Sequence, residues 1–146
     1  MKDVFTKDVS TAAREARERQ DPNHLLQAIP YAVLLGMRVG PEGLFHLPPL
    51  QSNVGNPTLP ALHGGAVGGF LEMAAIAHTM MVMEVVRVPK VIGFSIDYIR
   101  PGRLQETYAQ CEIERFGRKM VNVSMRAWQD DDSRHIAKAR LQFLLD

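Results

Sequence analysis

The stretch from Gly64 to about Val86 constrains the fold more than any other part of the chain. Its large apolar residues recur at helical spacing, and glycine and alanine fill most of the positions between them. A helix with small residues almost all round needs close cover, and a curved sheet gives closer cover than one neighbouring helix. We therefore predict a long central helix with a sheet wrapped around it.

After this segment, apolar and polar residues alternate in four successive runs separated by short turns. Strict alternation is typical of strands that bury one face, and short turns between long strands indicate antiparallel pairing. The residues expected to point inward are Ile92, Phe94, Ile96, Tyr98, Thr107, Ala109, Cys111, Ile113, Val121, Val123, Met125, Ala127, Ala137, Ala139, Leu141 and Phe143.

The N-terminal part is predicted to add short helices and strands. Residues 11–20 are good helix formers, and Asp21-Pro22 then begins a second short helix that Pro30 bends or ends. Two short strands are expected at residues 35–40 and 43–47.

Residues 48–62 are rich in Pro and Asn, so an irregular loop is expected there. Residues 1–146 are expected to form one α+β domain, with residues 1–30 as an N-terminal helical extension.

The composition limits which partners the protein is expected to bind and where in the cell it is expected to work. The formal net charge is +1, and no run of Lys and Arg is interleaved with aromatics, so we expect no nucleic-acid partner. The N-terminus lacks the apolar core of a signal peptide, and Glu72, His78 and Glu84 interrupt the longest apolar stretch, so we expect no membrane association. The one cysteine, Cys111, suits a reducing compartment, which favours a cytoplasmic protein.

Two short motifs carry a family resemblance. LHGGAVGGFLE at residues 62–72 and SIDYIRPG at residues 95–102, in this order of elements, resemble hotdog-fold acyl-CoA thioesterases of the phenylacetate-degradation and 4-hydroxybenzoyl-CoA thioesterase type. The resemblance covers about residues 25–145. It implies a hotdog fold, hydrolysis of an acyl-CoA thioester to a free acid and CoA, and no cofactor apart from the coenzyme A of the substrate.

The start of the central helix is a candidate oxyanion site. A helix that begins at Gly64 presents unpaired backbone N–H groups and the positive end of its dipole. The resemblance assigns the Gly64 N–H to polarising the thioester carbonyl, and Gly65 to the tight turn beside the substrate. The alternative is that both glycines only permit close helix packing.

Glu72 is the candidate catalytic acid, because it is the only acid between Gly64 and Met83. Burial raises the pKa of a carboxyl group toward the range of a general base. The resemblance implies that this acid either activates water or attacks the thioester itself. The alternative is a structural acid that is hydrogen-bonded across a subunit interface.

The spacing of these two residues predicts a homodimer. Glu72 follows Gly64 by eight residues, which is about 12 Å along a helix, yet both groups need to lie roughly 3 Å from one reacting centre. Two helices related by a two-fold axis satisfy this requirement, with Gly64 of one chain facing Glu72 of the other. We expect a homodimer with two shared sites, or a dimer of dimers.

The remaining candidates have weaker signals. His63 is a candidate to orient the substrate or to bond the loop. The resemblance implies that Asn56 positions the water or the carbonyl, with Asn53 as the second choice; either asparagine alternatively caps a turn. Relatives place CoA phosphates near strand ends that match Arg100 and Arg118, although each is alternatively a solvated turn residue. No metal site is expected, because the histidines are not flanked by ligands at known spacings.

Two departures from the family pattern keep other functions open. Ile76 occupies a position where some relatives carry a hydroxyl, and Val91 a position where others do; such a hydroxyl orients the acid or the water. The alternative function is therefore a non-catalytic acyl-CoA-binding or regulatory protein of the same fold. A hotdog dehydratase is a third reading, but His63 and Glu72 fit its proton-transfer pair poorly.

Overall fold

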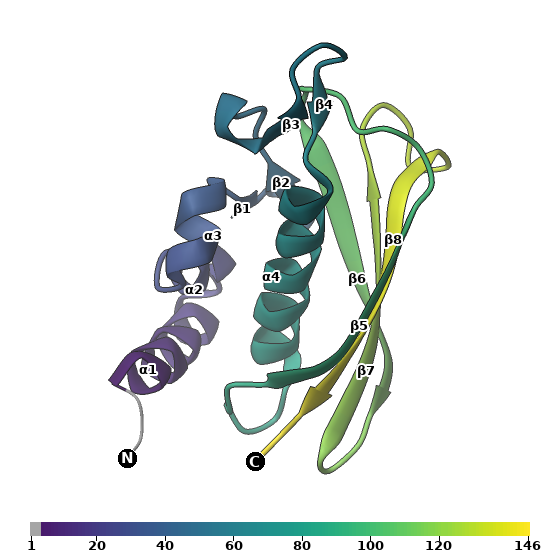
Figure 1. Cartoon of the computed structure of the whole chain (residues 1–146). Coiled ribbons are helices and arrows are strands. Elements are labelled where there is room, and N and C mark those ends of the chain that lie inside the picture. The colour runs from purple at the N-terminus through teal and green to yellow at the C-terminus, as the bar shows by residue number, and fades with distance from the viewer. Residues whose placement is uncertain (1–3) are drawn as a thin grey trace.

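The computed structural model describes the backbone of residues 4–146 and the side chains of residues 8–146, and three layers are visible in Figure 1. The long helix α4 (Gly64–Val82) forms the middle layer. A curved antiparallel sheet covers one side of α4, and helices α1 (Val4–Arg19), α2 (Pro22–Leu26) and α3 (Pro30–Leu35) cover the other. This is the predicted α+β hotdog fold.

The sheet has the strand order β1-β2-β6-β7-β8-β5, and every neighbouring pair is antiparallel. Its strands are β1 (Arg38–Val39), β2 (Phe45–Leu47), β5 (Lys90–Tyr98), β6 (Thr107–Phe116), β7 (Met120–Trp128) and β8 (His135–Leu144). Within residues 4–146, β5 pairs only with β8, so its other side is an open edge.

The core lies on both sides of α4, between α4 and the sheet and between α4 and helices α1 to α3, where Ala13, Leu25 and Leu35 are buried. All predicted inward residues of β7 and β8 are at most 3% exposed, which confirms the register inferred from alternation. Ala74, Ala75 and Ala77 of α4 are fully buried, so the small side chains of this helix are closely covered. By length and composition α4 resembles a membrane span, but 61% of that window is buried inside the fold, as in a core helix.

Local signals explain where the N-terminal helices begin and end. Asp21 caps α2 by accepting a hydrogen bond from the Asn23 N–H at 3.1 Å, and Pro30 occupies the first turn of α3. Gly36 ends α3 in the left-handed conformation with φ 68°.

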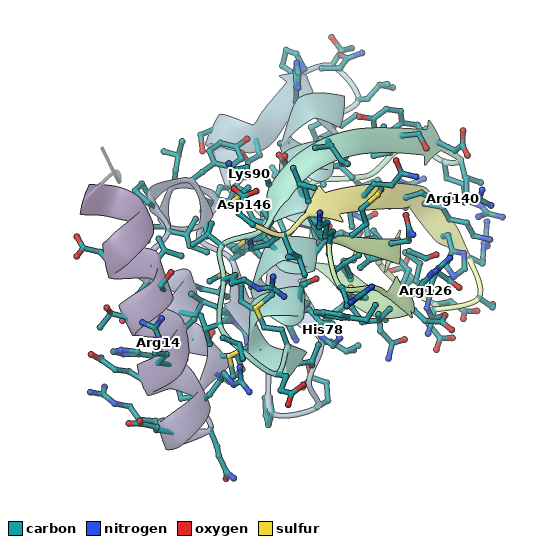
Figure 2. The ribbon with its side chains drawn as sticks, turned by 90° about the horizontal axis from the view of Figure 1, so that it is seen from below. Arg14, His78, Lys90, Arg126, Arg140 and Asp146 are labelled. Carbon is teal, nitrogen blue, oxygen red and sulfur yellow. The ribbon has the colours of Figure 1, made fainter. Side chains whose placement is uncertain are left out.

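Seen from below, Arg14 of α1 and Arg126 of β7 lie on opposite sides of α4 (Figure 2).

The expectation of an irregular loop at residues 48–62 is wrong in part. This segment contains a 3₁₀ helix at Gln51–Asn53 and a small hairpin of β3 (Val54–Asn56) and β4 (Ala61–Leu62). Pro57 and Pro60 lie in the hairpin turn, outside the paired residues, so they do not interrupt the pairing. The hairpin leads directly into α4.

Two further expectations differ in detail. α4 ends at Val82 rather than near Val86, because Met83 is already extended with φ −71° and ψ 149°. Ile92 is 52% exposed rather than inward, since the register shifts there and Val91 pairs opposite Phe143. At the same end of β5, Lys90 forms an ion pair with Asp146 (Figure 2).

Candidate functional site

His63 is the N-cap of α4, a role that its position in the sequence alone did not show. Its backbone is extended (φ −65°, ψ 133°), and its Nδ1 accepts a hydrogen bond from the Gly65 N–H at 2.8 Å. A ring nitrogen that accepts carries no proton, so in the neutral ring the proton is on Nε2. His63 is exposed, and this Nε2–H is therefore presented to solvent or to a ligand.

The Gly64 N–H remains without an acceptor in residues 4–146. The N–H of His63 bonds Asn53, that of Gly65 bonds His63, and those of Ala66 and Val67 both reach the His63 carbonyl. Gly64 thus supplies the one free donor of the first turn in the described chain, at the positive end of the helix dipole. The Gly65 N–H, by contrast, is already used by the cap.

Tyr98 at the end of β5 lies against this glycine. Its hydroxyl donates to the Gly64 carbonyl oxygen at 2.7 Å, and its ring atoms lie 3.2 to 3.3 Å from the position of a Cβ at residue 64. Phe94 of the same strand lies 3.6 Å from the equivalent position at Gly68. The glycine at residue 64 therefore allows the Tyr98 ring to approach the helix closely, whereas a Cβ at residue 68 would make only an ordinary van der Waals contact with Phe94.

The two asparagines before α4 have different surroundings. Asn53 is 8% exposed, its carbonyl accepts the His63 N–H at 2.7 Å, and its buried Nδ2 has no partner within the described residues. Asn56 is exposed in the hairpin, and its Oδ1 accepts the Thr58 N–H at 3.0 Å. The structure therefore brings Asn53 to the start of α4 and leaves Asn56 capping the β3–β4 turn.

Glu72 lies two turns further along α4 and is half-buried. Burial raises the pKa of its carboxyl group, because the charged form loses solvation. No hydrogen bond or ion pair of Glu72 occurs among residues 8–146. On a helix, Gly68 and Gly69 lie on the same face one turn before it. Because α4 is continuous from Gly64 to Val82, Glu72 and Gly64 of one chain stay about 12 Å apart.

Arg100 and Arg118 lie at opposite ends of the sheet. Arg100 follows β5 and donates to the His135 carbonyl at 2.7 Å, whereas Arg118 lies in the turn between β6 and β7. The ten residues of β6 separate these ends by about 33 Å. One chain therefore does not bring the two arginines together.

Arg100 instead borders a hollow of about 1080 Å³ with Arg103 and Arg134. This hollow reaches Ala61 of β4, and the Leu62 N–H bonds the Gly102 carbonyl at 2.8 Å, so it adjoins the strand that enters α4. Asp130 and Asp131 also line it. Arg134 comes from the β7–β8 loop, and nothing in its local sequence indicated that it would join Arg100.

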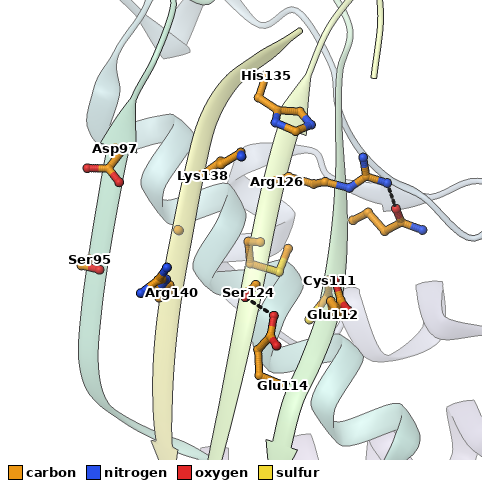
Figure 3. A pocket seen from close by; sticks show the side chains of 13 residues that line it. Ser95, Asp97, Cys111, Glu112, Glu114, Ser124, Arg126, His135, Lys138 and Arg140 are labelled. Carbon is orange, nitrogen blue, oxygen red and sulfur yellow. Dashed lines mark hydrogen bonds between the residues drawn. The ribbon is translucent and has the colours of Figure 1, made fainter. Parts of the chain in front are cut away.

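A second hollow, of about 670 Å³, lies on the outer face of the sheet (Figure 3). Figure 3 shows it on the side away from α4, so it is separate from Gly64 and Glu72. Ser124 donates to Glu114 there at 2.5 Å, and Arg126 bonds Gln110. The hollow has cationic and acidic side chains in equal number: Arg126, Lys138 and Arg140 against Asp97, Glu112 and Glu114.

The other reactive side chains of the described chain lie outside the site. Burial raises the pKa of the Cys111 thiol to about 12, so it is a poor nucleophile. Burial lowers the pKa of His78, which lies about 120° around α4 from Glu72. Among the described residues, no His, Cys, Asp and Glu side chains are grouped so as to hold a metal ion.

Comparison with known proteins gives one family. A family model described as the thioesterase superfamily matches residues 59–135, a stretch that contains Gly64, Glu72 and Arg100. A search of the curated proteins found no match.

Several solved structures share the fold. A protein from Chromobacterium violaceum is 42% identical, with a TM-score of 0.74 and coverage of 93% of this chain and 97% of that one. A thioesterase from Haemophilus influenzae is 16% identical, with a TM-score of 0.71 and coverage of 80% and 82%. A protein from Bacillus halodurans, solved with CoA, is 20% identical, with a TM-score of 0.67 and coverage of 100% and 93%. At these identities the last two show likeness of fold alone.

Proposed function

Because the chain belongs to the thioesterase superfamily, we propose that it hydrolyses an acyl-CoA thioester to a free acid and CoA. The observation that carries the proposal is the Gly64 N–H, which has no acceptor in residues 4–146 although its neighbours in the first turn are all bonded. A fixed donor of this kind stabilises the negative charge that develops on a thioester carbonyl oxygen during attack.

Glu72 supplies the second requirement, a base or nucleophile. Its carboxyl group has a pKa raised by burial and no bonding partner in the described part of the chain, so it is available to a substrate. As a base it takes a proton from the attacking water; as a nucleophile it forms a mixed anhydride that water then hydrolyses. In both routes the CoA thiolate leaves from the carbon polarised by Gly64.

A homodimer brings these groups together. The distance of about 12 Å between Gly64 and Glu72 of one chain is too long for one reacting centre, so each site takes its glycine from one chain and its acid from the other. The open edge of β5 supports this arrangement, since Phe94 and Tyr98 are 40% and 55% exposed there beside α4. An unpaired edge with exposed aromatics is a ready surface for a second copy.

The coenzyme A moiety is proposed to bind in the hollow bordered by Arg100, Arg103 and Arg134. Guanidinium groups bind phosphate oxygens in a forked geometry, and this hollow adjoins the strand that leads to Gly64. The CoA found in the Bacillus halodurans protein supports a ligand of this type. Arg118 stays a candidate only for a contact made from another chain.

The direct test uses purified protein with acetyl-, hexanoyl- and benzoyl-CoA, following free thiol, with Glu72→Gln beside the wild type. We expect Glu72→Gln to lose roughly 10² to 10⁴ in kcat, because the amide neither accepts a proton nor attacks. Hydrolysis at the wild-type rate in Glu72→Gln refutes the mechanism.

The alternative, a non-catalytic acyl-CoA-binding protein, is favoured by Ile76 and Val91, which supply no hydroxyl to orient the acid or the water. It predicts tight acyl-CoA binding without thiol release and no effect of Glu72→Gln on affinity. The same panel, read by calorimetry as well as by thiol release, separates the two functions.

A further inference from the structure

Tyr31 of α3 lies against α4 at the point where Gly69 leaves room for it. A Cβ at residue 69 would lie 2.6 Å from Cε1 and 2.7 Å from the hydroxyl oxygen of Tyr31. Side chains larger than hydrogen at residue 69 therefore displace the ring. The Tyr31 side chain is nevertheless 40% exposed, so part of the ring surface is open to a ligand.

Helix spacing places this ring near the candidate catalytic acid. Glu72 follows Gly69 by three residues, which places them on the same helix face. Helical side chains lean toward the N-terminus, so the Glu72 carboxylate lies over the turn that contains Gly68 and Gly69. Gly68 is faced by Phe94 of β5 at 3.6 Å. The acid thus lies in a strip of helix surface with Phe94 on one side and Tyr31 on the other.

From Tyr31 the open surface continues along α3 as apolar side chains. The helix Pro30–Leu35 has the sequence PYAVLL, without a charged residue. Val33 is 57% exposed and Leu34 is 70% exposed, and Leu34 follows Tyr31 at the spacing that shares a helix face. Adjoining exposed apolar side chains form a candidate binding surface.

We infer that the acyl group of the substrate is an uncharged, apolar group that packs on Tyr31 and Leu34, with Tyr31 determining specificity. This inference rests on the proposed function and adds the substrate class. The acyl group is the occupant of this surface because the apolar side chains begin beside Glu72, and the proposed mechanism places the thioester carbon at Glu72. An acyl group that ends in a carboxylate gains less from this surface, since the helix Pro30–Leu35 offers its charge no partner.

The test measures binding in the Glu72→Gln background, which prevents turnover, by calorimetry with acetyl-, butanoyl-, hexanoyl- and succinyl-CoA. Affinity is expected to rise about fourfold per added methylene and to fall for succinyl-CoA. Adding Tyr31→Ala should weaken hexanoyl-CoA binding about tenfold and leave acetyl-CoA within about twofold. Gly69→Ala, which displaces the ring, should do the same.

Two controls define the contribution of the ring. Tyr31→Phe retains the ring and should keep the parent chain-length profile. Val85→Ala shortens another exposed apolar side chain, 66% exposed beyond the end of α4, and should change nothing. In the catalytically intact protein, Tyr31→Ala should raise KM for hexanoyl-CoA more than it lowers kcat.

Equal acyl-chain profiles in Tyr31→Ala and its parent would overturn the inference. An equal loss of affinity for every acyl-CoA, together with dissociation of the oligomer in light scattering, would also overturn the inference. The α3 surface would then be an interface between copies of the chain. A wild type that releases no thiol from any substrate refutes the proposed function, while the binding profile still decides whether Tyr31 contacts the acyl group.

Discussion

Replacing Gly64 by proline removes the proposed oxyanion donor and leaves the other first-turn hydrogen bonds in place. Gly64 occupies the first helical position, where proline is favoured. Its N–H has no acceptor in residues 4–146, so proline breaks no hydrogen bond there. His63 already has φ −65° and ψ 133°, a conformation that a following proline prefers. Loss of one such donor costs about 2.7 to 4 kcal/mol of transition-state stabilisation, or roughly 10² to 10³ in kcat.

Gly64→Ala is the matched control, because it adds a Cβ and keeps the N–H. That Cβ would lie 3.2 Å from the Tyr98 ring, and both variants share this contact, whereas proline alone adds ring carbons at the nitrogen. The rate ratio of the alanine to the proline variant therefore reports replacement of the N–H by the ring carbon, with the Cβ contact cancelled. Thiol release from hexanoyl-CoA gives kcat, and circular dichroism with thermal melting confirms folding. Equal kcat values in two folded variants would refute the assignment of the oxyanion donor to Gly64.

Three further predictions concern pH and stability. Burial raises the pKa of Glu72 and the carboxylate is the active form, so kcat/KM should fall with decreasing pH already above the ordinary glutamate value of 4.5; a pH profile without this acidic limb contradicts the role of Glu72. The hydrogen bond from His46 lowers the pKa of Glu42 below its ordinary value of 4.5, so their contact stabilises the fold above pH 4.5 and this stabilisation is lost as pH falls through the lowered pKa. In urea unfolding, Glu42→Gln should be less stable than the wild type at pH 6 and about equally stable at pH 3. Phe143 is fully buried, so Phe143→Ala should cost about 3 to 5 kcal/mol in the same assay, and a cost below about 1 kcal/mol would contradict its place in the core.

The elements that periodicity defines were predictable. The apolar, alanine-rich pattern of α4 and the alternation in β7 and β8 reflect burial of a fixed face, and burial is what selects those residues. The β3–β4 hairpin and the bulge at Ile92 were not predictable, because short strands rich in Pro and Asn and single-residue register shifts leave no repeating signal.

The chemistry of the site was predictable only where a motif carries it. His-Gly-Gly and the acid at Glu72 have a fixed spacing, but the packing of Tyr98 on Gly64 depends on the pairing of β5 with β8. Likewise, Asn53 rather than Asn56 lies at the start of α4 because the hairpin carries Asn56 away. Arg100 and Arg134 meet only in the folded chain, and Arg118 is at the far end of β6.

The shared site is tested most directly in a heterodimer of one Gly64→Pro chain and one Glu72→Gln chain, purified through two different tags. One of its two sites then has both wild-type groups, and the other has neither. We predict about half of the wild-type activity from this heterodimer, although each parent homodimer is nearly inactive. A heterodimer no more active than its parents, or a fully active wild-type monomer, would contradict the account.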